Sequence, residues 1–196
     1  MPFRPNPFMM NRLNHFFQTD FLVENFNHLH SKFAFISVQY RSGDAAFGQS
    51  TWLRHPISSA KCFAVKAIES CHSYNNNKPC LFMITSDSQN GSQLIQQYIH
   101  KNVMKNHSFI SYPGEVAHLD MENNWSHLTV SQRKEYFLKT YLDWILLANS
   151  QEMIISRSGF GETAAWVHLP KSYRFIQDST NCRFDDKWIR KLPETT

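Results

Sequence analysis

Two short segments of this chain carry residue types that bind phosphate. In the first, an apolar run ends in Ser156-Arg157-Ser158-Gly159-Phe160-Gly161, and a helical pattern follows directly. The first N–H groups of such a helix have no intrahelical acceptor, and together with the helix dipole they stabilise an anion. Ser158 adds a hydroxyl donor, as does Thr163, and Gly159 lets a ligand approach the backbone closely. The segment predicts a site for a phosphate group.

The second segment lies upstream, where the apolar run 33–40 opens into Arg41-Ser42-Gly43-Asp44. A guanidinium at a strand end can hold a diphosphate through two parallel charge-assisted hydrogen bonds and stabilise a departing phosphate. The alternative is structural, with Arg41 paired to Asp44 or Asp87 so that the loop is held together. Beside the Ser158 segment, the phosphate-binding interpretation is favoured.

Two further carboxylates stand at informative positions. Asp87 follows an apolar run in Ser86-Asp87-Ser88, where this trio is also typical of the cap of a following helix. Asp143 interrupts the apolar stretch 141–147, and a carboxylate in such surroundings needs a partner. One option is an internal hydrogen bond to an N–H of a helix or loop. The other is the N1–H and amino edge of guanine, for which a carboxylate is a bidentate acceptor.

Alternating helix and strand patterns must position these residues. Periodicity predicts helices over 11–30, 60–74, 90–102, 129–149 and 159–168, and apolar runs predict strands over 33–40, 80–85, 108–112, 152–156 and 173–176. This alternation predicts an α/β, Rossmann-like fold, with a mainly parallel sheet and helices on both faces. Ligands bind such sheets at the carboxyl ends of the strands, so we expect Arg41, Asp87 and Ser158 to converge on one edge.

Length and composition favour one domain with a sizeable core. We expect a lead and amphipathic helix over 1–32, a Rossmann-like nucleotide-binding domain over 33–185, and a tail over 186–196. Three prolines within the first seven residues predict that residues 1–10 are loosely attached. The net charge of +4 comes from scattered basic residues, so a nucleic-acid partner is not expected.

Other classes of site and segment are disfavoured by spacing. The four cysteines and ten histidines show neither CxxC nor HxxxH patterns, so no metal site is expected. Buried free thiols are favoured over disulfides, and Cys62 and Cys71 lie too far apart on one predicted helix to bridge each other. No apolar run reaches the roughly 18 residues of a membrane helix, and the opening residues do not form a signal peptide.

Three Asn-x-Ser triplets, at Asn90, Asn106 and Asn124, match the acceptor pattern for N-linked glycosylation. About two such matches are expected by chance in a chain of this composition. The triplets therefore do not settle the compartment.

Taken in order, four motifs resemble the C-terminal, donor-binding half of GDP-fucose-dependent fucosyltransferases. The motifs are Gln39-Tyr40-Arg41-Ser42-Gly43-Asp44, Phe82-Met83-Ile84-Thr85-Ser86-Asp87-Ser88, Leu142-Asp143-Trp144 and Ser156-Arg157-Ser158-Gly159-Phe160. That superfamily includes core α1,6, bacterial nodulation, α1,2 and protein O-fucosyltransferases, and the resemblance covers residues 33–177. It implies half of a GT-B-type fold, inverting transfer of fucose to a glycan or protein hydroxyl, no metal or other cofactor, and a Golgi or secretory location.

The resemblance also assigns residues. It implies that Arg41 binds the β-phosphate, that Asp143 receives guanine, and that Ser158, Gly159 and Phe160 hold the diphosphate. We count Asp87 with the substrate-binding residues. Gln39 stands where the family has a histidine that helps to hold the nucleotide. Asp44 is the nearby carboxylate to test as the acceptor base.

The family's N-terminal acceptor domain and membrane anchor have no counterpart before Phe33, so we expect an incomplete enzyme. The alternative is a non-catalytic, truncated or degenerate domain that retains nucleotide-sugar binding. A phosphatase or kinase-like enzyme is a poorer match, because the chain has no Cys-x5-Arg loop and no phosphate-loop lysine.

Overall fold

The computed structural model describes residues 7–21, 28–43, 55–73, 78–104, 106–111, 128–167, 172–178 and 181–185. Its centre is a sheet ordered β3-β2-β1-β4-β5-β6, in which β1 to β5 are parallel and β6 is antiparallel to β5. The strands are β1 (Ala34–Tyr40), β2 (Cys80–Ser86), β3 (His107–Ile110), β4 (Glu152–Ile155), β5 (Ser172–Asp178) and β6 (Arg183–Asp185). The predicted α/β, Rossmann-like fold is confirmed.

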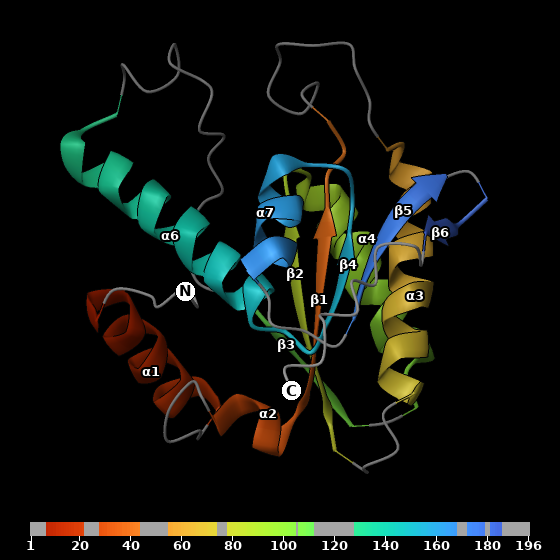
Figure 1. The fold of residues 1–196 in the computed structure, drawn as a ribbon, viewed down its shortest axis with the longest axis horizontal. Helices are drawn as coiled ribbons and strands as arrows, with labels where there is room; N and C mark the ends of the chain where they lie inside the picture. Colours follow the sequence, from red (N-terminus) through yellow and green to blue (C-terminus); the bar gives the residue numbers. More distant parts are fainter. Residues whose placement is uncertain are drawn as a thin grey trace, which may run out of the picture.

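Helices cover both faces of the sheet (Figure 1). One face carries α3 (Ala60–Ser73) and α4 (Gln89–Asn102), with the short 3-10 helix η3 (Ile57–Ser59) leading into α3. The other carries α6 (Val130–Ala148), α7 (Gly159–Val167), α1 (Pro7–Phe21) and α2 (Leu29–Lys32). Alternate residues of β1 point to opposite faces, so Ile36 and Val38 pack beside α3 while Phe35 packs with α1 and α6. The core therefore lies in two layers.

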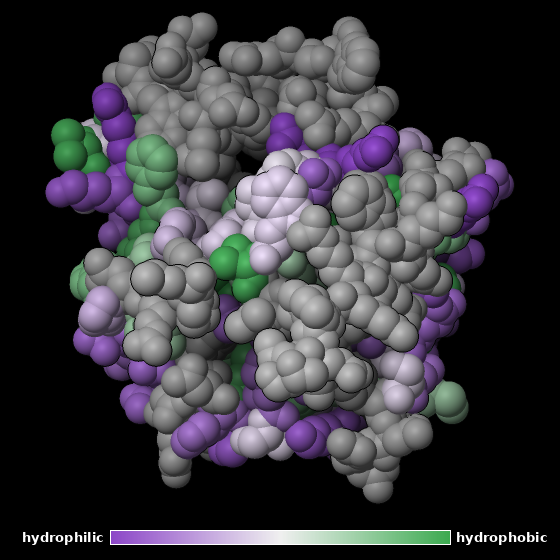
Figure 2. Space-filling model, viewed as in Figure 1, coloured by the Kyte–Doolittle hydropathy of each residue, from purple (hydrophilic) through white to green (hydrophobic). Residues whose placement is uncertain are grey.

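The outer surface of α6 and α7 mixes polar and apolar residues, seen as green and pale areas among purple in Figure 2. Val130, Phe137 and Tyr141 on α6 and Trp166 on α7 are exposed. The opposite sides of both helices are buried against the sheet. None of the helices in the described residues is long and apolar enough to cross a membrane.

The N-terminal region differs from the prediction. The single helix expected over 11–30 is observed as α1 and α2, and α1 begins at Pro7, where a proline is favoured because the first helical N–H needs no acceptor. The expectation that residues up to 10 are loosely attached is therefore wrong for residues 7–10. Leu13 and Phe17 are fully buried in the cluster that includes Phe35 and Leu142. The helix belongs to the same core as the sheet.

The C-terminal strands also extend beyond the prediction. β5 runs over Ser172–Asp178, and the unpredicted β6 folds back on it as an antiparallel edge strand. A three-residue strand is too short for a periodicity of two to be recognised in a sequence.

The cysteines are paired, so the expectation of buried free thiols is wrong. Cys71 at the end of α3 is bonded to Cys80 at the start of β2, and Cys62 on α3 is bonded to Cys182 beside β6. Cys62 and Cys71 do not bridge each other, as their spacing predicted. Each finds its partner on another element, and the spacing of cysteines in the sequence does not reveal such neighbours. The two bonds fasten α3 to both halves of the sheet.

The two disulfides should contribute unequally to stability. Cys62 and Cys182 are 120 residues apart, whereas Cys71 and Cys80 are nine apart. Because a cross-link restricts the unfolded chain more when it closes a longer loop, serine replacement of the first pair should cost about 5 kcal/mol and of the second about 3 kcal/mol. Urea denaturation of the two double variants measures the difference. Equal losses would contradict the loop-length argument.

Candidate functional site

The carboxyl ends of β1 and β4 lie side by side at the point where the strand order reverses. Gln39 is in register with Ile155, the last residue of β4, and Ser156 follows it. The Ser156 hydroxyl accepts the Arg41 N–H at 2.9 Å and donates to the Gln39 side-chain oxygen Oε1 at 3.0 Å. The Ser156 N–H donates to the Gln39 carbonyl at 2.9 Å and contacts Oε1 at 3.2 Å. Ser156, fully buried, therefore joins the two strand ends.

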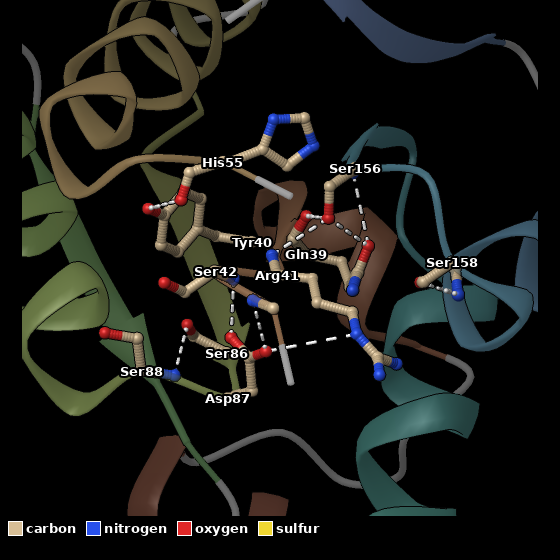
Figure 3. A network of polar contacts seen from close by, with 12 residues as sticks. Gln39, Tyr40, Arg41, Ser42, His55, Ser86, Asp87, Ser88, Ser156 and Ser158 are labelled. Atoms are coloured by element: carbon tan, nitrogen blue, oxygen red, sulfur yellow. Dashed lines mark hydrogen bonds and ion pairs between the residues drawn. The ribbon is translucent and has the colours of Figure 1, made fainter. Parts of the chain in front are cut away.

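Gln39 carries a pair of donors at this edge. Because its side-chain oxygen accepts the Ser156 N–H, the amide nitrogen Nε2 must point the other way with its two N–H groups. Within the described part of the chain Nε2 donates to no protein acceptor, although the side chain is only 5% exposed. Figure 3 shows this amide between Arg41 and Ser158. The two N–H groups of this amide are therefore available to a ligand that supplies acceptors.

The start of α7 adds further donors. Ser158 caps the helix: its hydroxyl accepts the Gly161 N–H at 3.1 Å and its carbonyl accepts the Glu162 N–H at 2.9 Å. Among the described contacts, the N–H groups of Gly159 and Phe160 have no acceptor. They point out of the helix at its positive end, as the sequence predicted for an anion site. Thr163 does not contribute, because its hydroxyl donates to the Gly159 carbonyl at 2.7 Å.

Arg41 is held in place by Asp87 at the end of β2. The Asp87 carboxylate accepts the N–H groups of Ser42 at 2.7 Å and Gly43 at 3.0 Å, and Arg41 Nε lies 3.9 Å from Asp87 Oδ2. Gly43 has a φ of 128°, a conformation that favours glycine. The Arg41–Asp87 pairing that we considered from the sequence is thus present. It involves Nε, and Figure 3 shows the guanidinium extending from Asp87 towards α7.

The helix-capping function considered for the 86–88 segment falls to Ser88, whose hydroxyl accepts the Gly91 N–H at 3.1 Å at the start of α4. Ser86 accepts the Ser88 N–H at 3.0 Å. Asp87 is left to bind the loop after β1. Burial raises the pKa of Asp87, while the two loop N–H groups and the charge of Arg41 act in the opposite direction.

Asp143 has a partner that we did not anticipate. It is only 3% exposed on α6, and Lys139 Nζ contacts its two carboxylate oxygens at 2.7 and 2.6 Å. Thr85 lies at 3.5 Å, and since Thr85 pairs with Gln39 across the sheet, the ion pair borders the site. Burial raises the pKa of Asp143, and Lys139 opposes this. The four-residue spacing of Lys139 and Asp143 was the signal in the sequence. Guanine recognition by Asp143 stays a prediction.

The remaining predicted residues occupy other positions. The Phe160 ring packs on the core cluster shared by α6, β4 and α7, which leaves its backbone N–H as the group near the site. Asp44 lies outside the described residues. Nowhere in the described ranges do three or more metal-ligating side chains gather. Ser156 belongs to the predicted phosphate-binding segment, but the sequence analysis assigned it no role of its own, although a serine directly after a buried strand is a recognisable signal.

The fold is that of a Rossmann-like α/β domain, and hydrogen-bond donors gather at its switch point between β1 and β4. The fold is similar to that of the α1,6-fucosyltransferase NodZ in a crystal soaked with GDP-fucose. The alignment has a TM-score of 0.48 and 14% identity and covers 93% of this chain and 49% of NodZ, so this chain spans about half of that protein. No family model matches the chain, and no curated protein does. The low similarity leaves the function to be argued from the site.

Two glycines offer a matched test of the site's packing. A Cβ at Gly161 would meet Gln39 Oε1 at 2.8 Å and Ile155 Cβ at 3.3 Å, whereas a Cβ at Gly159 would meet nothing within 4 Å. Gly161→Ala should therefore displace the Gln39 amide and lower stability by about 1–3 kcal/mol. Gly159→Ala should leave stability unchanged or raise it by up to about 1 kcal/mol. Urea midpoints compare the variants, and equal losses would refute the packing described here.

The buried ion pair gives a second prediction. Asp143→Asn leaves the Lys139 ammonium buried without a counter-charge, so stability should fall by about 3–5 kcal/mol. The double variant Lys139→Met, Asp143→Leu replaces the pair by apolar groups of similar size and should recover most of that loss. Denaturant unfolding measures stability, and GDP titration of the double variant tests guanine recognition separately. A single variant as stable as the parent would contradict the structural importance of the pair.

Proposed function

We propose that this chain is a fucosyltransferase-like glycosyltransferase domain that binds GDP-fucose and passes fucose to a glycan or protein hydroxyl. The observation that carries the proposal is the group of donors at the β1–β4 switch point. The Gln39 amide nitrogen, the Arg41 guanidinium and the first N–H groups of α7 gather there, and the groups facing the site are donors. Such a set suits a ligand made of acceptors, above all a diphosphate.

The carboxylates nearby do not oppose this reading. Asp87 is engaged by the N–H groups of Ser42 and Gly43, and Asp143 by Lys139, so each negative charge is compensated within the protein. An incoming diphosphate would therefore meet Arg41 and the positive end of α7. The ordered motifs at 39–44, 82–88, 142–144 and 156–160 support a GDP-sugar rather than another diphosphate.

In the proposed reaction the bond between the anomeric carbon of fucose and the β-phosphate oxygen breaks, and the electron pair leaves with GDP. The acceptor hydroxyl oxygen bonds to that carbon and gives up its proton to a base. Arg41, with the start of α7, stabilises the charge that develops on the departing phosphate. Asp44 is our candidate for the base, and the residues proposed here require no metal or other cofactor.

Binding and transfer are separable in this chain. The proposed donor groups all lie within the described residues, whereas transfer also needs an acceptor hydroxyl held at the anomeric carbon. The alternative function is that of a domain that binds the nucleotide sugar without transferring it. Measuring both donor binding and transfer on the same purified protein distinguishes the two. We expect donor binding with little or no turnover on glycan acceptors.

Calorimetric titration tests the donor site. The chain should bind GDP-fucose and GDP more tightly than UDP-sugars. Arg41→Ala should weaken GDP binding by about 10- to 100-fold, the loss expected for a charged hydrogen bond, and Gln39→Leu should weaken it too. Arg12→Ala, on the exposed face of α1, removes the same charge far from the site and serves as the control. Unchanged affinity in Arg41→Ala would exclude this site, and strong turnover on a glycan would exclude the binding-only alternative.

A further inference from the structure

The disulfides show in which environment the chain folds. All four cysteines are paired, and one pair joins residues 120 positions apart in the sequence. Disulfides of this structural kind form and persist in oxidising compartments, since cytosolic thiols are kept reduced. In eukaryotic cells the oxidising folding compartment is also the one in which asparagines of Asn-x-Ser/Thr triplets receive N-linked glycans. Although the number of triplets alone is uninformative, the disulfides indicate that the triplets are exposed to the glycosylation machinery.

The triplets differ in their place in the fold. Asn124 lies outside the described residues. Asn90 is exposed in the first turn of α4, two residues after Ser88 and at the same sheet edge as the candidate site. Asn106 directly precedes β3, at the amino end of the strands. Because β1, β2 and β3 are parallel, Asn106, which precedes β3, is at the end of the sheet opposite to Arg41, which follows β1.

Asn106 combines a fixed backbone with an open side chain. Its carbonyl accepts the Cys80 N–H at 3.0 Å, so the residue is held against the start of β2 beside the Cys71–Cys80 disulfide. Its own side chain is exposed, and so is Ser108, whose hydroxyl completes the triplet. His107 between them is not a proline, which the pattern would exclude. A glycan here would project into solvent without disturbing a packed residue.

We propose that Asn106 is an N-linked glycosylation site. The anomeric carbon of a lipid-linked oligosaccharide diphosphate forms a bond to Asn106 Nδ2. The bond from that carbon to phosphate breaks, the electron pair leaves with the lipid diphosphate, and the Nδ2 proton passes to a base of the oligosaccharide-transferring enzyme. Among the strands of the described residues, β3 lies at the outer end of the sheet order and pairs with β2. A glycan at its start covers an edge that would otherwise offer unpaired N–H and C=O groups to another chain.

Expression of the full chain in human cells, directed into the secretory pathway by an appended signal sequence, tests the proposal. Peptide mass spectrometry should find a glycan on the peptide that contains Asn106, and peptide-N-glycosidase should remove it and leave aspartate at that position. Asn106→Gln and Ser108→Ala should abolish the modification. Ser108→Thr keeps the hydroxyl and should retain it, and Asn90→Gln should leave the Asn106 glycan in place.

The glycan is added while the chain enters the compartment, so variants that fold poorly can still be scored in cell extracts. Unmodified Asn106 in the wild-type chain would overturn the proposal. So would alkylation of the four cysteines without prior reduction, because the disulfides are the premise of the argument. These results do not depend on GDP-fucose binding, so this proposal and the proposed function can fail separately.

Discussion

The bond between Ser156 and Gln39 is the interaction on which the candidate site depends. It closes the carboxyl ends of β1 and β4, which are neighbours in the sheet although their sequences lie more than a hundred residues apart. Because Ser156 donates hydrogen bonds to the amide oxygen of Gln39, the two amide N–H groups are turned towards the site. Because it also accepts the Arg41 N–H, the guanidinium starts from a fixed backbone. The helix α7 begins three residues after Ser156, at Gly159, and its first N–H groups complete the set of donors.

The two faces of β1 differ in a way that supports this arrangement. Ile36, Val38 and Tyr40 pack in an apolar layer, whereas Ser37 and Gln39 face α6 and α7. Ser37 meets the Ser150 hydroxyl at 2.5 Å. A shift of β1 against β4 would separate both polar pairs inside the protein, at a cost of about 1–3 kcal/mol for each unsatisfied group. The polar pairs therefore help to specify the register that places Arg41 beside the Ser158 turn.

Two carboxylates, Asp87 and Asp143, lie near the candidate anion site, and each is compensated by partners inside the protein. Burial raises the pKa of both Asp87 and Asp143, so each ionised form needs compensation inside the fold. Asp87 finds it in the loop after β1 and in Arg41, and Asp143 finds it in Lys139. Asp87 thereby positions the loop after β1 that carries Arg41, the residue proposed to bind phosphate. Asp143 forms a buried ion pair with Lys139 close to Gln39. Lys139 would have to move away before the Asp143 carboxylate could accept hydrogen bonds from guanine.

The sequence by itself determined the fold class, because alternating apolar runs and helical periodicity allow little other than a parallel sheet with helices on both faces. It also located Arg41 and the Ser158 turn at strand ends, since local patterns mark where buried strands stop. Tertiary structure alone decided the partners: Cys62 with Cys182, Gln39 with Ser156, and Asp87 with the loop at Ser42. These contacts join segments that are distant in the chain, and a pattern of spacing along one segment carries no information about them. Lys139 and Asp143 are only four residues apart, but the sequence does not show that both side chains are buried and therefore bind each other.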